Sequence, residues 1–210
     1  MDRFYFKTRE WIKFKVLRPL LLGVGHWMGR YSTVGDRPVF DKGEFPWTGL
    51  LESQYPAIRS EFEKVMAYRK EFPSLQQIQR EKEVLNQDHR WQTFFLYGFG
   101  IKVTRNCDMC PVTTSLLEEI PNMKTAFFSV LSPGKHIPAH KGIFKGIIRS
   151  HLGIIVPGKP GDCRMRIEEG EIHWKEGEMV VFDDTYDHEV WNDTDKTRVV
   201  LLIDVVRPYR

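Results

Sequence analysis

The feature that most constrains this sequence is a series of short strand-like runs in its second half. From Met123 onward, runs rich in apolar and β-branched residues are separated by turn-forming pairs such as Pro133-Gly134, Pro157-Gly158 and Glu176-Gly177. Short strands and turns at this spacing are typical of an antiparallel barrel or jelly roll. The strands are expected at residues 126–131, 147–156, 165–167, 179–182, 189–191 and 199–206.

The residues before this region have a different periodicity. Apolar residues recur at steps of four, three, four and three, which is helical spacing. Pro56 is tolerated near the start of such a helix and Pro73 should end it. The positions that define this helix are Leu51, Tyr55, Ile58, Phe62 and Val65.

The other segments are assigned by composition. Residues 31–49 are rich in Gly, Pro and Asp and are interpreted as an irregular connection. Residues 74–90 are polar and suit a short helix and a loop, residues 94–103 suit a strand, and residues 113–119 suit a short helix. We therefore divide the 210 residues into an N-terminal extension and connection, 1–48, and one β domain with helical support at its N-terminal side, 49–210.

Charge argues against nucleic acid as a partner. The formal net charge is only +3, from 31 basic and 28 acidic residues, and nucleic-acid binding usually needs a stronger basic surface. The excess is concentrated in residues 1–20, which carry six basic and two acidic side chains before the apolar stretch Leu20 to Val24. This stretch is too short to span a bilayer. Two alternatives stay open: a helix packed on its own domain, or peripheral membrane contact through residues 1–28.

The cysteines indicate a reducing compartment. Their number is odd, and no secretory signal pattern precedes them. Cys107 and Cys110 have zinc-like spacing, but no second pair exists to complete such a site. We therefore expect structural thiols and a cytoplasmic location, with membrane attachment at the periphery as the alternative. The three cysteines are Cys107, Cys110 and Cys163.

Histidines are concentrated in the β-rich half. Neutral imidazole is a good ligand for iron and other first-row metals. Spacing alone, however, does not select a pair among the five histidines of this half: His136, His140, His151, His173 and His188.

Ordered motifs do select a pair. Pro133–Gly142 contains His140, Arg149–Gly153 follows it, and Phe182–Asn192 contains His188. Together with Arg198, and over roughly Trp91 to Pro208, these motifs resemble the aspartyl/asparaginyl β-hydroxylase family, which includes related bacterial lipid A hydroxylases. The resemblance implies a mainly β fold with flanking α-helices: a double-stranded β-helix, which is a cupin-like jelly roll.

The resemblance also implies a cofactor and a site. His140 and His188 match the ligands of Fe(II), and molecular oxygen reacts there with the co-substrate 2-oxoglutarate. Arg198 matches the residue for the distal carboxylate of 2-oxoglutarate, because a planar guanidinium can bind a carboxylate through two hydrogen bonds. The remaining co-substrate residues that it implies are Ser129, Arg149 and His151.

One position departs from the wider dioxygenase class. A carboxylate two residues after the first histidine usually completes the metal triad, and Gly142 stands there. Two protein ligands are therefore expected. The absence is a feature of the aspartyl/asparaginyl branch and tells against the lipid A branch, and it also leaves room for a halide ligand.

The expected activity is hydroxylation of an unactivated C–H bond in a small-molecule, peptide or lipid substrate. The preferred substrate is an aspartyl or asparaginyl residue or a related acid, which is hydroxylated at its β carbon. Arg105, Arg164 and Arg166 are candidate partners for the substrate carboxylate. The alternatives are hydroxylation of a lipid acyl chain, as in lipid A, and a non-catalytic cupin-like binding protein.

Overall fold

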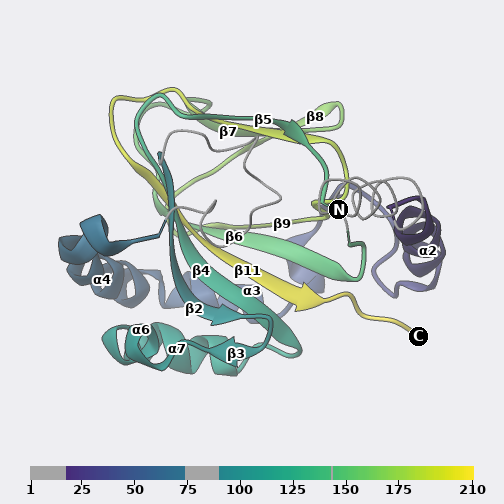
Figure 1. The fold of residues 1–210 in the computed structure, drawn as a ribbon, viewed down its shortest axis with the longest axis horizontal. Helices are drawn as coiled ribbons and strands as arrows, with labels where there is room; N and C mark the ends of the chain where they lie inside the picture. Colours follow the sequence, from purple (N-terminus) through teal and green to yellow (C-terminus); the bar gives the residue numbers. More distant parts are fainter. Residues whose placement is uncertain (1–17, 74–89, 143) are drawn as a thin grey trace, which may run out of the picture.

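The computed structural model describes residues 18–73, 90–142 and 144–210. The basic segment at residues 1–17 and the polar segment at residues 74–89 lie outside the described residues. Two antiparallel sheets face each other (Figure 1).

The large sheet has the strand order β1-β9-β6-β11-β4-β2-β3. Its central strand, β11, is buried along almost its whole length, because both of its faces are covered. The seven strands are β1 (Val39–Phe40), β2 (Trp91–Gly98), β3 (Ile101–Lys102), β4 (Met123–Leu131), β6 (Ile147–Ile155), β9 (Met179–Phe182) and β11 (Arg198–Val206).

The small sheet has the order β5-β10-β7-β8. Its strands are β5 (His136–His140), β7 (Cys163–Ile167), β8 (Gly170–His173) and β10 (His188–Asn192). From β4 to β11 the chain crosses between the two sheets at every connection except the β7–β8 hairpin. This alternation is that of a jelly roll and confirms the expected fold.

Helices cover the outer face of the large sheet (Figure 1). Leu51, Ile58, Phe62 and Val65 are fully buried there and belong to the main hydrophobic core, so the helical periodicity predicted the face that packs. A second apolar cluster lies around β7 and β10. The helices concerned are α3 (Trp47–Ser53), α4 (Tyr55–Val65), α6 (Thr104–Met109) and α7 (Pro111–Glu118), with 3-10 turns η2 (Lys42–Glu44) and η3 (Met66–Glu71).

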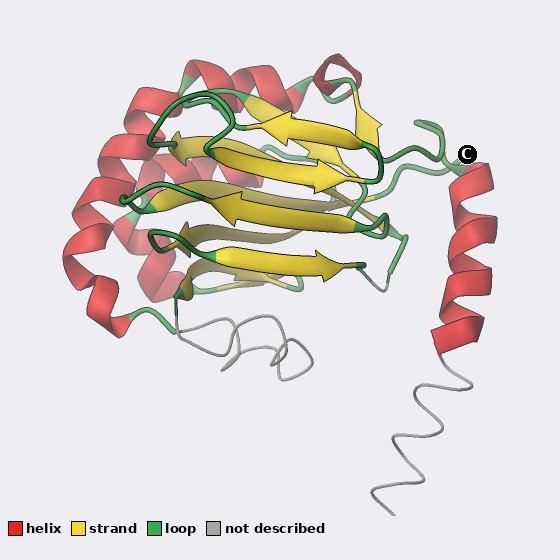
Figure 2. Cartoon of the chain, turned by 90° about the horizontal axis from the view of Figure 1, so that it is seen from above, coloured by secondary structure: helices red, strands yellow, loops and turns green. Residues whose placement is uncertain are grey.

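The described part of the N-terminal extension includes α2 and β1, besides η2 and the start of α3. Helix α2 (Arg18–Tyr31) stands apart from the other helices, at one end of the sheets (Figure 2). Strand β1 pairs with β9, so this part of the chain also contributes to the large sheet. Within the described part of the chain, no helix is both long enough and apolar enough to cross a bilayer.

Candidate metal and co-substrate site

His140 and His188 are brought together by strand pairing. They are directly opposite each other where β5 and β10 pair, and their ring centroids are 4.1 Å apart. His188 is buried and His140 is partly exposed. The two histidines that the motifs selected are therefore neighbours in space.

Backbone carbonyls fix the orientation of both rings. Nδ1 of His140 lies 2.8 Å from the carbonyl oxygen of Pro138, and Nδ1 of His188 lies 2.9 Å from that of Tyr186. A carbonyl only accepts, so each Nδ1 carries a proton, and in a neutral imidazole Nε2 is then the nitrogen that can bind a metal. This is the tautomer in which histidine binds a metal through Nε2. Among the described residues, no group of three or more His, Cys, Asp and Glu side chains is arranged to hold a metal.

A row of ring contacts continues from His188 into the space between the sheets. Phe182 lies 6.2 Å from His188 and 5.0 Å from His151 between ring centroids. His151 stacks on Trp174 at 5.7 Å. The guanidinium carbon of Arg198 lies 4.3 Å from the centroid of the Trp174 ring. Arg198 and His151 therefore belong to the same site as the histidine pair.

Several buried polar atoms in this row have no hydrogen-bond partner among the described residues. They are both ring nitrogens of His151, Nε1 of Trp174 and Nε of Arg198. Buried polar atoms are rarely left unsatisfied in native proteins, because each one costs desolvation energy. Their concentration in one place fits a ligand that supplies oxygen acceptors.

Burial also perturbs the charges of this group. Burial lowers the pKa of Arg198 to about 10. Burial and then the positive charge of Arg198 hold the pKa of His151 well below its ordinary value, so His151 is neutral. A bound carboxylate would offset the loss of solvation of the Arg198 guanidinium.

Ser129 lies on the same inner face. Ser129 is opposite Val200 and Leu131 is opposite Arg198 where β4 and β11 pair, so Ser129 and Arg198 are diagonal neighbours. Its hydroxyl oxygen accepts a hydrogen bond from Nε1 of Trp91 at 3.0 Å. That bond leaves the hydroxyl proton to be donated to another group.

Arg149 differs from the other predicted co-substrate residues. Its Nε and Nη2 donate to the two carboxylate oxygens of Asp204 at 2.8 and 2.9 Å, and its Nη1 lies 2.8 Å from Oδ2 of Asp184. Burial alone would lower the pKa of Arg149, but these two carboxylates outweigh burial and raise it. The guanidinium is thus already neutralised by acidic side chains.

The space beside Gly142 is filled by Asp184. A Cβ atom placed on Gly142 would lie 2.6 Å from Cγ and 2.7 Å from Oδ2 of Asp184, and the Gly142 N–H donates to the Asp184 carbonyl at 2.6 Å. The position where the wider class carries a metal-binding carboxylate therefore lies against the carboxylate that Arg149 holds. The sequence pattern points to the glycine but not to Asp184, its partner in space.

Two site residues were missed by sequence reasoning. The sequence gives Trp174 no role at the site, and Phe182 only ends the strand expected at residues 179–182. Trp174 instead lies between His151 and Arg198, and Phe182 lies between His151 and His188. The sequence around an aromatic residue does not indicate which side chains its ring will contact in the folded protein.

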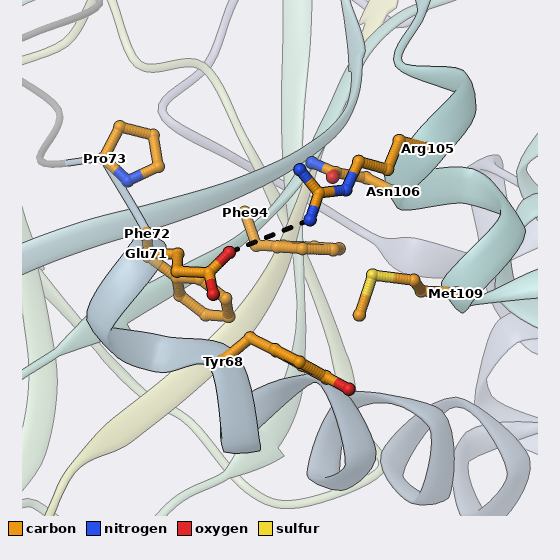
Figure 3. Close-up of a pocket in the computed structure, with 8 residues that line it drawn as sticks. All are labelled: Tyr68, Glu71, Phe72, Pro73, Phe94, Arg105, Asn106 and Met109. Carbon is orange, nitrogen blue, oxygen red and sulfur yellow. Dashed lines mark ion pairs between the residues drawn. The ribbon is translucent and has the colours of Figure 1, made fainter.

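The arginines proposed for a substrate carboxylate are elsewhere or already paired. Arg105 borders a cavity of about 350 Å³ on the helical side of the large sheet, where it faces Glu71 at 3.9 Å (Figure 3). Arg164 pairs with Asp193 and Arg166 with Asp187.

Comparison with known proteins points to the same family as the motifs. A family model described as aspartyl/asparaginyl beta-hydroxylase matches residues 52–208. The chain belongs to this family. The resemblance inferred from the ordered motifs is thereby confirmed.

Members of the family with curated descriptions differ in their substrates. The chain is 46% identical over 181 residues to an ornithine lipid ester-linked acyl 2-hydroxylase of Rhizobium tropici. This alignment covers 86% of this chain and 64% of that protein. It is 30% identical over 204 residues to the aspartyl/asparaginyl beta-hydroxylase of Homo sapiens. That alignment covers 88% of this chain and 26% of the human protein. The chain spans less than two thirds of the length of either relative.

Among solved structures, a prolyl-4-hydroxylase of Pseudomonas putida aligns with 73% of this chain and 87% of its own, at 17% identity and a TM-score of 0.48.

Proposed function

We propose that this member of the aspartyl/asparaginyl β-hydroxylase family is an Fe(II)- and 2-oxoglutarate-dependent hydroxylase. One observation carries the proposal: two neighbouring histidines, each held by a backbone carbonyl at Nδ1, adjoin a buried group of unsatisfied polar atoms around Arg198. A non-catalytic binding protein would have little need for this combination.

His140 and His188 would hold the iron through Nε2. When bound, iron and 2-oxoglutarate supply, with oxygen, the oxidant for an unactivated C–H bond. The protein contributes orientation: the carbonyls of Pro138 and Tyr186 hold the two rings. The apolar faces of Phe182 and Trp174 keep bulk water away from the space behind them.

Arg198 would bind the distal carboxylate of 2-oxoglutarate, and Ser129 would donate its hydroxyl proton to the same group. His151, neutral because of burial, would donate one ring N–H to an oxygen of the co-substrate. Arg149 would reach a ligand only by exchanging one of its two carboxylate partners. We therefore propose that its main task is to hold Asp184 against Gly142.

The substrate that we propose is the acyl chain of a lipid. The 46% identity to an acyl hydroxylase over most of this chain supports it. Hydroxylation of an aspartyl or asparaginyl residue is the second candidate, supported by the 30% identity to the human relative and by Gly142. Arg164 and Arg166 are already paired, so neither is an available cation for an acidic substrate.

The test of the co-substrate is succinate formation from 2-oxoglutarate with Fe(II) in air. His188→Ala should abolish turnover, whereas His173→Ala, an exposed histidine paired with Glu171, should not. Arg198→Lys should raise the KM for 2-oxoglutarate roughly tenfold or more, because a lysine loses the bidentate geometry. Arg164→Lys is the matched control. Turnover that survives His188→Ala would refute the assignment of the metal ligands.

The substrate class is tested separately with the same loaded enzyme. An ornithine lipid and an aspartyl-containing peptide are each incubated with it, and mass spectrometry measures the gain of one oxygen atom. Oxygen added to the acyl chain alone supports the lipid; oxygen added to the peptide alone selects the second candidate.

A further inference from the structure

Helix α2 has two different faces. Gly25 and Ser32 are buried, Gly29 is buried between them, and Met28 is partly buried on the same side. Val24, Trp27 and Tyr31 are 45%, 60% and 51% exposed. These three recur at steps of three and four, so they share one side of the helix. An apolar stripe on a helix normally faces the core, but on α2 it faces solvent.

The buried face fixes α2 to the loop that follows His140. A Cβ atom on Gly25 would lie 3.3 Å from Cβ of Lys145, and one on Gly29 would lie 3.1 Å from Cε of the same lysine. Two glycines thus permit the close approach of helix and loop. Lys145 in turn pairs with Asp36 at 2.6 Å and Asp183 at 3.3 Å. The helix is therefore anchored between the first metal-ligand position and the turn before the second.

The same loop extends the exposed apolar stripe. Phe144, four residues after His140, is 48% exposed. A Cβ atom on Gly146 would meet both the Phe144 ring and the Met28 methyl group, so Phe144 adjoins α2. The Trp27 and Tyr31 rings contact each other at 4.7 Å. We call Val24, Trp27, Tyr31 and Phe144 the α2 apolar face; it borders the end of the barrel where His140 lies.

Basic side chains are available near this face. Arg30 on α2 and Lys141 beside His140 are both exposed, whereas Asp36, which lies against Gly29, is already paired with Lys145. In the sequence, the 17 residues that precede α2 contain five basic side chains and two acidic ones. Exposed Trp and Tyr flanked by basic residues are the composition of a surface that lies in the interface of an anionic membrane. A protein partner with an apolar groove would not explain the basic flank.

We propose that the α2 apolar face docks on an anionic lipid bilayer and presents the His140 end of the barrel to the membrane surface. This inference rests on the proposed lipid substrate and adds the surface by which that substrate is reached. Trp27, Tyr31 and Phe144 enter the region between headgroups and acyl chains, while Arg30 and Lys141 remain at headgroup level.

The experiment is co-sedimentation of the full, Fe(II)-loaded chain with sucrose-loaded vesicles. Vesicles of phosphatidylcholine alone are compared with vesicles that also contain phosphatidylglycerol. The variants are Trp27→Ala, Phe144→Ala and the Trp27→Ala/Tyr31→Ala pair. Tyr68→Ala is the matched control, because Tyr68 is 51% exposed on η3, on the helical side of the large sheet. Unfolding temperatures establish that each variant is folded.

We expect wild type to bind the anionic vesicles, and to bind them more weakly as salt is raised. Trp27→Ala should lower partitioning about tenfold, the pair should lower it further, and Tyr68→Ala should leave it unchanged. Equal binding by wild type and the folded pair variant would overturn the proposal. So would a wild type that ignores vesicles but forms a dimer in sedimentation velocity that Trp27→Ala dissociates.

A hydroxylation assay distinguishes failure of the docking surface from failure of the proposed lipid hydroxylase function. A lipid dispersed in detergent reaches the site without a bilayer, so the α2 variants should hydroxylate it as wild type does. If the α2 variants lose activity on vesicles but keep it on the detergent-dispersed lipid, the docking proposal is supported. Vesicle binding that needs the α2 apolar face, in a protein that hydroxylates only a peptide, would retain the docking surface and refute the lipid substrate.

Discussion

Gly142 offers the sharpest test of how the site is packed. Any side chain there would place Cβ within 2.7 Å of both Cγ and Oδ2 of Asp184, so Asp184 must move. Its carboxylate is buried and held at 2.8 Å by Arg149. Removing one partner of a buried ion pair costs about 3–5 kcal/mol. Arg149 keeps its two bonds to Asp204, so we expect Gly142→Ala to cost less, about 1–3 kcal/mol, the usual range for overpacking.

The assay is urea unfolding of a double-mutant cycle. Gly142→Ala, Asp184→Ala and the double variant are compared with wild type, and Gly170→Ala serves as the control because its Cβ would have only an ordinary contact, 3.5 Å from the Ile167 carbonyl. If Asp184 causes the clash, Gly142→Ala should be nearly harmless once Asp184 is alanine, which gives a coupling of about 1–3 kcal/mol. Coupling below about 0.5 kcal/mol would refute the reasoning. Because Asp184 occupies the space beside residue 142, we also expect that Gly142→Asp will not provide a third metal ligand.

Three further predictions concern the scaffold. Gly153→Ala should lower the free energy of unfolding by about 3 kcal/mol or more in urea titration, because its Cβ would meet the backbone carbonyl of Lys175, which cannot rotate away; a variant as stable as wild type would contradict this. Glu61→Ala should cost about 2–3 kcal/mol in the same assay, since its buried carboxylate accepts two backbone N–H bonds and one hydroxyl bond at the start of α7; an unchanged urea midpoint would speak against it. Burial alone raises the pKa of Asp36, but bonds to Lys145 and Tyr186 outweigh it and hold the pKa below 3.8. Its contribution to stability is therefore present above pH 3.8 and lost as the pH falls through the lowered value, so Asp36→Asn should reduce the unfolding temperature at pH 7 and progressively less below pH 3.8; a pH-independent difference would exclude this cause.

Much of the fold could be predicted from local pattern. The strand runs at 126–131, 147–156, 179–182 and 199–206 fall on β4, β6, β9 and β11 with boundary shifts of a few residues at most. Strand β5 was missed because Pro138 lowers its β propensity. A proline is accepted there because β5 is at the edge of the small sheet. Helix α6 and strand β8 were missed because they are short and polar.

The site was predicted less completely. Motif order selected His140, His188 and Arg198, which the fold brings close together, and the resemblance added Arg149 and His151, which lie two residues apart on β6. It could not show that Arg149 already has two carboxylate partners, because Asp184 and Asp204 come from other segments. The role of Trp174 was equally hidden, since its contacts with His151 and Arg198 exist only after both sheets have formed.

The two proposed iron ligands lie on strands that differ in how many neighbouring strands they pair with. His188 is on β10, which has neighbours on both sides, whereas His140 ends β5, an edge strand whose one partner among the described strands is β10. Edge strands open more readily than central ones. Iron bound as proposed would therefore be released whenever β5 detaches from β10. Conversely, a metal bound to both histidines would link β5 to β10, so metal loss and separation of these two strands would occur together.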